Sequence, residues 1–137
     1  MQIILWDTES GRLVGKVKAS NAAWLSVSPD GLHLAEAGAD KRVRIRNSST
    51  LEVEREFRAH EDFVSGVAWH QKLPLLVTAS KDGCIRVWNT DSFGEVEELR
   101  TEPSIGYICV EIPPDGSDLN VVGNGGNGKI NVYQPKS

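Results

Sequence analysis

The sequence predicts an all-β protein assembled from repeated four-stranded units. Strand-forming segments recur about every ten residues, and turn residues such as Ser28-Pro29-Asp30-Gly31 separate them. Four strands end on a similar residue pair: Trp6-Asp7, Arg46-Asn47, Trp88-Asn89 and Tyr133-Gln134. The second members of these pairs are 40, 42 and 45 residues apart. A period of about 40–45 residues with four strands per unit is typical of a β-propeller, in which four-stranded blades stand around an axis.

The predicted elements divide into three repeats. We expect units over residues 11–47, 51–89 and 94–134, preceded by one extra N-terminal strand at 2–7. The fold class is therefore a partial β-propeller of about three four-stranded antiparallel blades plus that strand. The expected strands are 2–7, 12–19, 22–28, 33–39, 43–47, 51–59, 64–70, 75–80, 84–89, 94–100, 107–112, 119–124 and 130–134.

Two segments rich in Glu and Arg, 51–59 and 95–101, could be read as helices. In the first, Leu51, Val53 and Phe57 are spaced by even numbers of residues, which places them on one face of a strand. A helix would need apolar residues at steps of three and four. We therefore predict that both segments are charged outer strands, because charge at a sheet edge opposes unwanted pairing.

Composition excludes several classes of protein. The chain has 137 residues, 39% of them hydrophobic and 25% charged, which is typical of a globular domain. The net charge of −4 argues against direct nucleic-acid binding, which depends on many Lys and Arg residues. No segment resembles a signal peptide or is long enough for a membrane span, so we expect cytoplasmic or nuclear localisation. Cys84 and Cys109 form neither a disulfide framework nor a metal-binding pair, and no cofactor is predicted.

One local exception to the acidic balance is the strand that contains Arg42, Arg44 and Arg46. Strict alternation places these three side chains on one face and Val43 and Ile45 on the other. We favour a solvated strand face over a site for an acidic ligand.

The turns and strand ends resemble those of the WD-repeat family of β-propellers. The resemblance covers essentially the whole chain and is strongest in the middle repeat. It is carried by Trp6-Asp7, by Pro29-Asp30-Gly31 and Pro114-Asp115-Gly116, and by Lys81-Asp82-Gly83 before the strand Ile85-Arg86-Val87-Trp88.

The resemblance implies a hydrogen-bonded tetrad in the middle repeat, formed by His60, Thr78, Asp82 and Trp88. The chemistry is reasonable: a buried indole N–H needs an acceptor, a hydroxyl both accepts and donates, and a carboxylate fixes one imidazole tautomer. A His–Asp pair near a hydroxyl also permits a catalytic triad. We disfavour that interpretation, because the hydroxyl is expected inside a sheet and no nucleophile elbow flanks it.

The other repeats depart from this pattern. At the equivalent offsets the first repeat has Lys18, Glu36, Asp40 and Arg46, so it cannot form the tetrad. A Glu36–Arg46 ion pair could replace it, although an exposed pair would contribute little. The third repeat has Tyr133 in the Trp position.

Other candidate motifs are structural in this interpretation. Residues 123–129 match the spacing of a phosphate-binding loop, but Ile130 replaces the Ser or Thr and a strand follows instead of a helix. His33, His60 and His70 lack metal-ligand spacing. Trp24 and Trp69 are predicted to lie in the core or between blades.

Three repeats are too few to close a propeller, which needs about four blades or more. Three arrangements stay open: the C-terminal part or a completing subunit of a larger propeller, a homodimer that completes one ring, and an open form with three blades.

We expect a non-catalytic scaffold for protein–protein interaction, with protein or peptide partners. The alternatives are a self-completing homodimeric binding module and, in a different class, a propeller-based hydrolase. The resemblance implies partner-binding residues beside the strand starts and the turn before the Asp: Phe63, Ser65, Lys81, Asn21, Ala23 and Ala39.

Overall fold

The strands of the chain form four antiparallel sheets. The computed structural model describes residues 2–19, 22–70, 72–100, 105–111, 120–125 and 130–133, and its side chains at 2–19, 24–70 and 72–100. The strands are β1 (Gln2–Trp6), β2 (Leu13–Lys18), β3 (Ala22–Val27), β4 (His33–Gly38), β5 (Arg42–Asn47), β6 (Val53–Arg58), β7 (Val64–Trp69), β8 (Leu75–Ser80), β9 (Cys84–Asn89), β10 (Glu95–Arg100), β11 (Ile105–Glu111), β12 (Asn120–Gly125) and β13 (Ile130–Tyr133).

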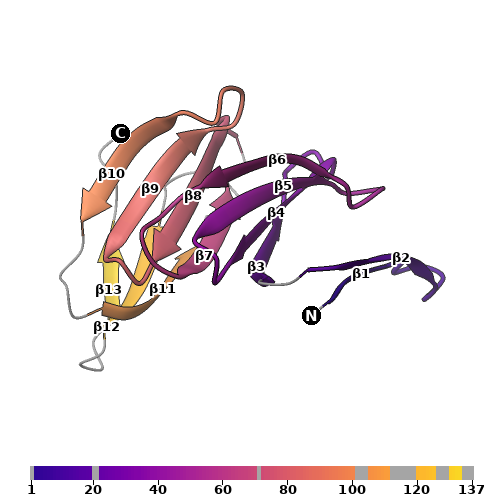
Figure 1. Cartoon of the computed structure of the whole chain (residues 1–137), viewed down its shortest axis with the longest axis horizontal. Helices are drawn as coiled ribbons and strands as arrows, with labels where there is room; N and C mark the ends of the chain where they lie inside the picture. The colour runs from indigo at the N-terminus through magenta and orange to yellow at the C-terminus, as the bar shows by residue number, and fades with distance from the viewer. Residues whose placement is uncertain are drawn as a thin grey trace.

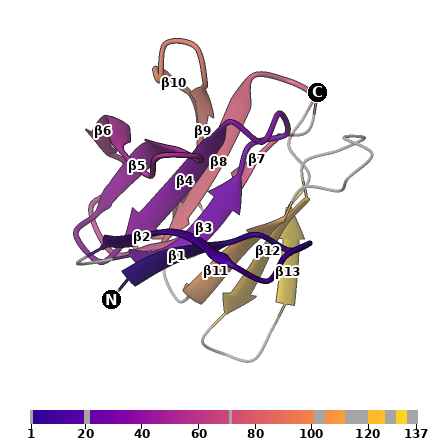
Figure 2. The ribbon, with the colours of Figure 1, turned by 90° about the vertical axis from the view of Figure 1, so that its right-hand side faces the viewer.

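Two of the sheets are complete four-stranded blades. One has the order β3-β4-β5-β6, called blade 1 below, and the other has the order β7-β8-β9-β10, called blade 2. They stand side by side, with the β1-β2 pair next to blade 1 and the β11-β12-β13 sheet next to blade 2 (Figures 1 and 2). The all-β class and the propeller architecture are thus confirmed.

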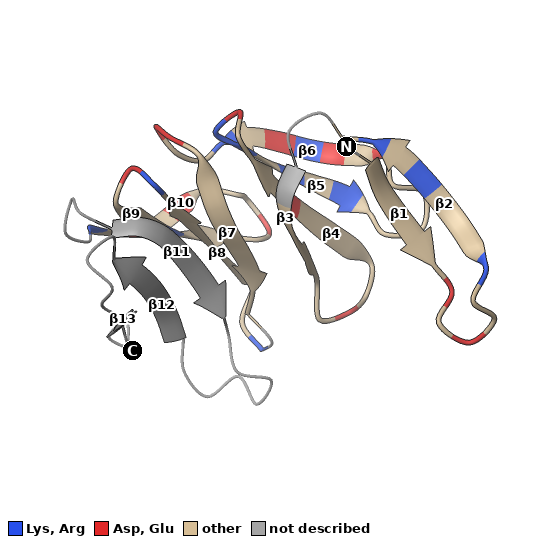
Figure 3. Ribbon diagram, turned by 90° about the horizontal axis from the view of Figure 1, so that it is seen from below, with Lys and Arg blue, Asp and Glu red and all other residues tan. Residues whose placement is uncertain are grey.

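The strands are distributed differently from the predicted units. Strand β2 pairs with β1 rather than with β3, and β10 pairs with β9 rather than with β11. The chain therefore begins with a pair of strands, not one extra strand, and its last sheet has three strands among the described residues. The first strand of each predicted unit is therefore the outer strand of the blade before it, as β6 is for blade 1 and β10 is for blade 2. The predicted outer strands are confirmed as β6 within segment 51–59 and β10 within segment 95–101. The ribbon of β6 carries both acidic and basic residues, and that of β2 carries basic ones (Figure 3).

The same turn follows β1, β5 and β9 and establishes that these three strands are equivalent. Asp7, Asn47 and Asn89 each accept a hydrogen bond on Oδ1 from the backbone N–H two residues later, at 2.8 Å in each case. The residue four positions later has a left-handed backbone: Gly11, Leu51 and Phe93 have φ values of 70°, 62° and 55°. Side-chain burial compensates the strain at Leu51, and packing against the core does so at Phe93.

The core lies between the two complete blades. Val43 and Ile45 of β5 pack with Val67 and Trp69 of β7, and the Trp69 indole donates a hydrogen bond of 3.0 Å to the Ser26 carbonyl oxygen of the neighbouring blade. A smaller cluster joins Ile3 of β1 to blade 1. Trp69 is therefore a blade-packing residue as predicted. Trp24 is not buried in the core, because 39% of it is exposed on the innermost strand of blade 1.

Within the described residues there is no helix long and apolar enough to cross a membrane. The turn at 114–116 and most of the loop at 123–129 lie outside the described residues.

Candidate functional site

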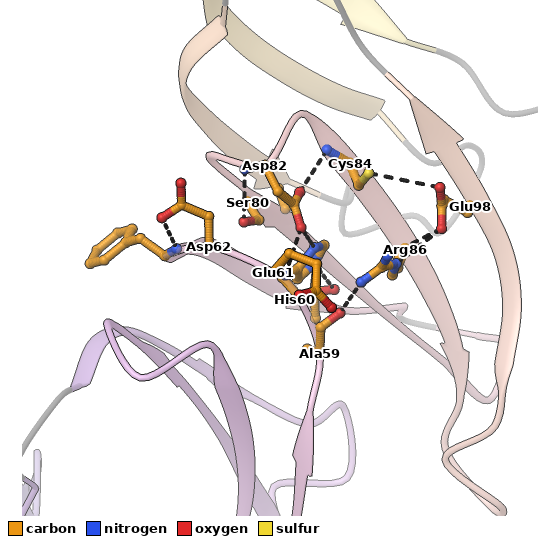
Figure 4. Close-up of polar contacts among 12 residues, drawn as sticks. Ala59, His60, Glu61, Asp62, Ser80, Asp82, Cys84, Arg86 and Glu98 are labelled. Carbon is orange, nitrogen blue, oxygen red and sulfur yellow. Dashed lines mark hydrogen bonds and ion pairs between the residues drawn. The ribbon is translucent and has the colours of Figure 1, made fainter. Parts of the chain in front are cut away.

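A continuous hydrogen-bonded network runs through blade 2 (Figure 4). The fully buried His60 ring lies before β7, with Nδ1 at 3.0 Å from Asp82 Oδ2 and Nε2 at 2.7 Å from Thr78 Oγ1. The Trp88 indole N–H donates to the same Thr78 oxygen at 3.0 Å. Since Thr78 accepts from Trp88, its hydroxyl proton is available to His60 Nε2, and the Nδ1 proton of His60 is donated to Asp82. Strands β8 and β9 and two loops are joined by this network.

Asp82 also fixes the backbone around it. One of its oxygens accepts from the Glu61 N–H at 3.0 Å and the other accepts from the Cys84 N–H at 2.8 Å. Burial acts to raise the pKa of Asp82, but the Glu61 N–H, the charge of His60 and the Cys84 N–H together lower it. Burial lowers the pKa of His60 despite the nearby carboxylate. The pair is therefore held as neutral imidazole and carboxylate near neutral pH.

This geometry does not suit a catalytic triad. The Thr78 hydroxyl is in the middle of β8, fully buried, and bonded to both His60 and Trp88. A substrate carbonyl could not approach it without opening the blade. Cys84 is also unsuited to nucleophilic chemistry, because burial raises the pKa of its thiol and keeps it protonated.

A second set of contacts attaches the outer strand to blade 2. The Arg86 guanidinium donates to the Ala59 carbonyl oxygen at 2.5 Å and to Glu98 of β10 at 3.2 Å (Figure 4). The same residue therefore holds both the loop before β7 and the edge strand.

Blade 1 has a buried ion pair where blade 2 has the Thr78–Trp88 bond. Arg46 Nε donates to Glu36 Oε2 at 2.6 Å and Arg46 Nη1 donates to the Leu51 carbonyl oxygen at 2.8 Å. The side chains of Arg46 and Glu36 are only 8% and 2% exposed. The expectation of an exposed, weak pair is therefore wrong, because the Leu51 turn and the β1-β2 pair cover this face of β5.

The arginine face of β5 is solvated as predicted at Arg42, whose side chain is 46% exposed, but Arg44 and Arg46 are largely covered. Arg44 pairs with Asp40 and, at 3.1 Å, with Glu56 of the outer strand, while Arg42 pairs with Glu56 at 2.9 Å. Since carboxylates of the same blade already neutralise these arginines, this face does not constitute a site for an acidic ligand.

The six candidate partner-binding residues fall into different environments. The Lys81 ammonium lies 5.3 Å from the centroid of the half-buried Phe63 ring. The backbone N–H of Lys81 donates a hydrogen bond of 3.0 Å to the Phe63 carbonyl oxygen. Ala39 is exposed at the equivalent turn of blade 1. Ser65 is 7% exposed, and its hydroxyl donates to the Ala79 carbonyl oxygen at 3.4 Å. Ala23 is in β3, where only its backbone is described, and Asn21 lies outside the described residues.

The sequence interpretation missed a groove between the two complete blades. It has a volume of about 500 Å³, and its lining includes Asp30 and Ile45 of blade 1 with Trp69, Pro74 and Phe93 of blade 2. The His33 and Trp69 rings stack across it at 6.3 Å. No sequence motif indicates this groove, because its lining comes from strands and turns that are distant in sequence. In the part of the chain whose side chains are described, no group of His, Cys, Asp or Glu could hold a metal ion.

The family comparison decides the identity of these repeats. The model for the "WD domain, G-beta repeat" matches residues 51–89, the segment that contains all four network residues. The chain belongs to the WD-repeat family. A relative at 35% identity is named as a WD repeat-containing protein, and the solved structures have the same fold.

Among the relatives, Protein HIR1 of Cryptococcus neoformans var. neoformans is 32% identical over 126 residues, which cover 88% of this chain and 14% of that protein. The LST8 homolog of Drosophila melanogaster is 33% identical over 110 residues, covering 73% of this chain and 35% of the relative. The crystal structure of the RRP9 WD40 repeats superimposes with a TM-score of 0.73 at 23% identity, over 96% of this chain and 44% of that one. The WD-repeat chain thus spans less than half of each of these proteins.

In WD-repeat terms, blade 2 has the complete network and blade 1 has an ion pair at two of the four positions. The matched family is a repeat family and not a catalytic one, which fits an interaction scaffold.

Proposed function

We propose that this chain is a non-catalytic protein-interaction scaffold and forms consecutive blades of a larger WD-repeat propeller. The observation that carries the proposal is a difference in burial between equivalent positions. Val67 and Trp69 of β7 face blade 1 and are 1% and 6% exposed. Leu25 and Val27, their equivalents on β3, are 43% and 57% exposed. The inner strands that would cover them are absent from the β1-β2 sheet.

The coverage of known proteins supports the same proposal. The chain aligns with 44% of the RRP9 chain and 14% of HIR1, so these proteins have ample additional sequence for further blades. A ring completed in this way would bury the apolar face of β3 and leave its rims accessible.

Strand pairing disfavours the alternative of a self-completing homodimer. The last described sheet, β11-β12-β13, lacks an outer strand, and β2 of a second copy could supply one. However, β2 is already paired with β1 along its length. Transfer of β2 would break this pairing and leave β1 isolated, whereas additional blades satisfy both ends of the chain.

Self-association of the isolated chain tests this proposal. At increasing concentration the wild-type chain is expected to show a rising average mass by light scattering, because the apolar β3 face is uncovered. The double variant Leu25→Asp/Val27→Asp should remain monomeric and keep the wild-type melting temperature. The matched variant Val67→Asp, which buries a charge between blades, should lose cooperative unfolding.

A monodisperse wild-type monomer at all concentrations would contradict the proposal. Unfolding of the β3 double variant would also contradict it, since that result would mean that the face is already covered.

The partner-binding surface that we propose is the rim at Phe63, Lys81 and Ala39. Lys81 and Ala39 occupy equivalent turns of adjacent blades, and both are exposed. The Phe63 ring beneath Lys81 offers an aromatic surface of the kind that anchors peptides. Ser65 is buried, so its contribution to this surface would be to support the strand.

Site-specific photo-crosslinking tests the rim. Benzoylphenylalanine at position 63 of the parent protein in cells is expected to give defined protein adducts, with benzoylphenylalanine at Val96 as the matched control. Val96 is exposed on the outer strand β10, away from the rim. Equal adducts at both positions, or adducts only at position 96, would contradict a rim-specific role.

A further inference from the structure

The groove between the two complete blades contains a hydrogen-bond donor that the fold does not use. His70 lines this groove and is only 6% exposed. Its Nδ1 accepts from the backbone N–H groups of Lys72 and Leu73, at 3.1 and 2.9 Å, so the ring proton stands on Nε2. None of the described residues accepts a hydrogen bond from Nε2. Since nearly buried N–H groups are normally paired, the acceptor is expected from outside the chain.

The equivalent turn of blade 1 shows that the turn itself requires only an acceptor. The backbone N–H of Ser28 donates to the His33 carbonyl oxygen, and that of His70 donates to the Leu75 carbonyl oxygen, at 2.8 Å in both blades. The Ser28 hydroxyl then accepts from the His33 N–H at 2.9 Å. A small hydroxyl thus serves in blade 1 where an imidazole stands in blade 2. The Nε2–H of His70 is therefore not needed for the turn and is available to a ligand.

Carboxylates from both blades also line the groove. Asp91 of blade 2 is exposed, and its carboxylate has no partner in the part of the chain whose side chains are described. Asp30 of blade 1 accepts on Oδ1 from the Ser28 hydroxyl and from the Leu32 N–H. These two bonds lower the pKa of Asp30, so its carboxylate is charged near neutral pH. Together Asp91 and Asp30 favour a cationic group between the blades.

The basic residues of the groove do not cancel this negative charge. The Arg55 guanidinium lies 5.0 Å from the centroid of the Phe93 ring and donates to the Ser92 carbonyl oxygen at 3.2 Å, so it is already engaged. Lys72 is exposed and is the remaining positive charge. With Glu54, the described lining has three carboxylates and two basic side chains. The groove is therefore acidic on balance.

We propose that this groove binds an extended peptide segment of a partner protein, in which an arginine or lysine stands beside an apolar side chain. A peptide carbonyl oxygen accepts from His70 Nε2, and the cation pairs with Asp91 and Asp30. The apolar side chain packs on Leu73, which lines the groove and is 54% exposed. This inference rests on the proposed scaffold function and adds a second site. The groove lies at the end of β7, whereas the rim at Phe63 precedes its start.

Peptide selection tests the proposal on the intact chain, because both walls of the groove belong to described blades. A hexapeptide library displayed on phage is selected on the immobilised wild-type chain and counter-selected on the double variant His70→Asn/Asp91→Asn. Asparagine keeps an oxygen near the place of Nδ1 for the turn amides and has no donor in the place of Nε2. The surviving peptides are then synthesised for surface plasmon resonance.

The dissociation constants are compared for the wild type and four variants: His70→Asn, Asp91→Asn, Lys72→Gln and Glu97→Gln. Glu97 is the matched control, because it is exposed on β10 and does not line the groove. The melting temperature of each variant establishes that it is folded. Since the chain is immobilised and the peptide is in solution, self-association of the chain does not affect the measurement.

Selection is expected to enrich peptides with Arg or Lys next to an apolar residue. His70→Asn should weaken their binding about three- to tenfold, through the lost hydrogen bond. Asp91→Asn should weaken it about two- to fivefold, as expected for a partly exposed ion pair. Lys72→Gln should strengthen it by up to about threefold, because a repelling charge is removed. Glu97→Gln should leave it unchanged.

Three results would overturn the groove site: no surviving peptide, enrichment of acidic peptides, or equal binding by the wild type and Asp91→Asn. If His70→Asn does not fold, selection against Asp91→Asn alone and the opposite effects of Asp91→Asn and Lys72→Gln decide the question. None of these outcomes alters the self-association or rim crosslinking results. Failure of this inference is therefore distinguishable from failure of the proposed function.

Discussion

Replacement of Glu36 by Leu is expected to destabilise the chain by about 3–5 kcal/mol, the largest effect of a single substitution in blade 1. The reason is that the guanidinium of Arg46 would remain buried without its carboxylate partner. Arg46 would keep its buried position but lose the carboxylate at 2.6 Å, and only the Leu51 carbonyl oxygen would still accept from it. Arg44 would also lose the Glu36 oxygen at 3.7 Å. Urea unfolding followed by tryptophan fluorescence measures the loss.

The control for this substitution is the double variant Glu36→Leu/Arg46→Leu. Two apolar side chains in contact leave no buried charge, so most of the lost stability should return. A single variant as stable as the wild type would mean that the pair is solvated. A double variant no more stable than the single one would mean that Glu36 acts through contacts other than Arg46.

Thr78→Val is expected to cost about 2–5 kcal/mol, because it leaves two buried groups without their partner. His60 Nε2 would lose its bond of 2.7 Å and the Trp88 indole N–H its bond of 3.0 Å, while the size of the side chain hardly changes. The indole N–H of Trp88 should also exchange faster with solvent. Urea unfolding and proton exchange by NMR measure these two effects.

Thr78→Ser is the matched variant for the network. It keeps the hydroxyl and removes one methyl group, so a loss of only about 1 kcal/mol is expected. If Val and Ser reduced stability equally, the methyl packing of Thr78 rather than its hydrogen bonds would be the source of its contribution.

The alternation of apolar and polar residues, together with the turn residues, was sufficient to predict where the strands lie in the sequence. The predicted segment 64–70 corresponds to β7 (Val64–Trp69), and 84–89 matches β9 (Cys84–Asn89). Alternation of apolar and polar residues fixes which face a side chain occupies, so Arg44 and Arg46 were correctly placed opposite Val43 and Ile45. It does not fix which strand lies alongside. For this reason β2 and β10 were placed in the wrong blades.

Burial was predicted less well than the strands, because it depends on neighbours distant in sequence. Trp24 was predicted to lie in the core or between blades, but 39% of it is exposed on β3. The Glu36–Arg46 pair was expected to be exposed, but residues around Leu51 and the β1-β2 pair cover it. Ser65 was grouped with Phe63 as a partner-binding candidate, but its side chain is buried within the blade, at 7% exposure.

The sequence by itself determined the repeat and the all-β class, because these depend on spacing and on local chemistry, and its resemblance to the WD-repeat family identified the four network residues. Only the tertiary structure decided which sheet each outer strand joins, that an ion pair is buried in blade 1, and that a groove lies between the two complete blades. Each of these depends on contacts between segments tens of residues apart. Such contacts follow from how the blades pack, and no local pattern encodes them.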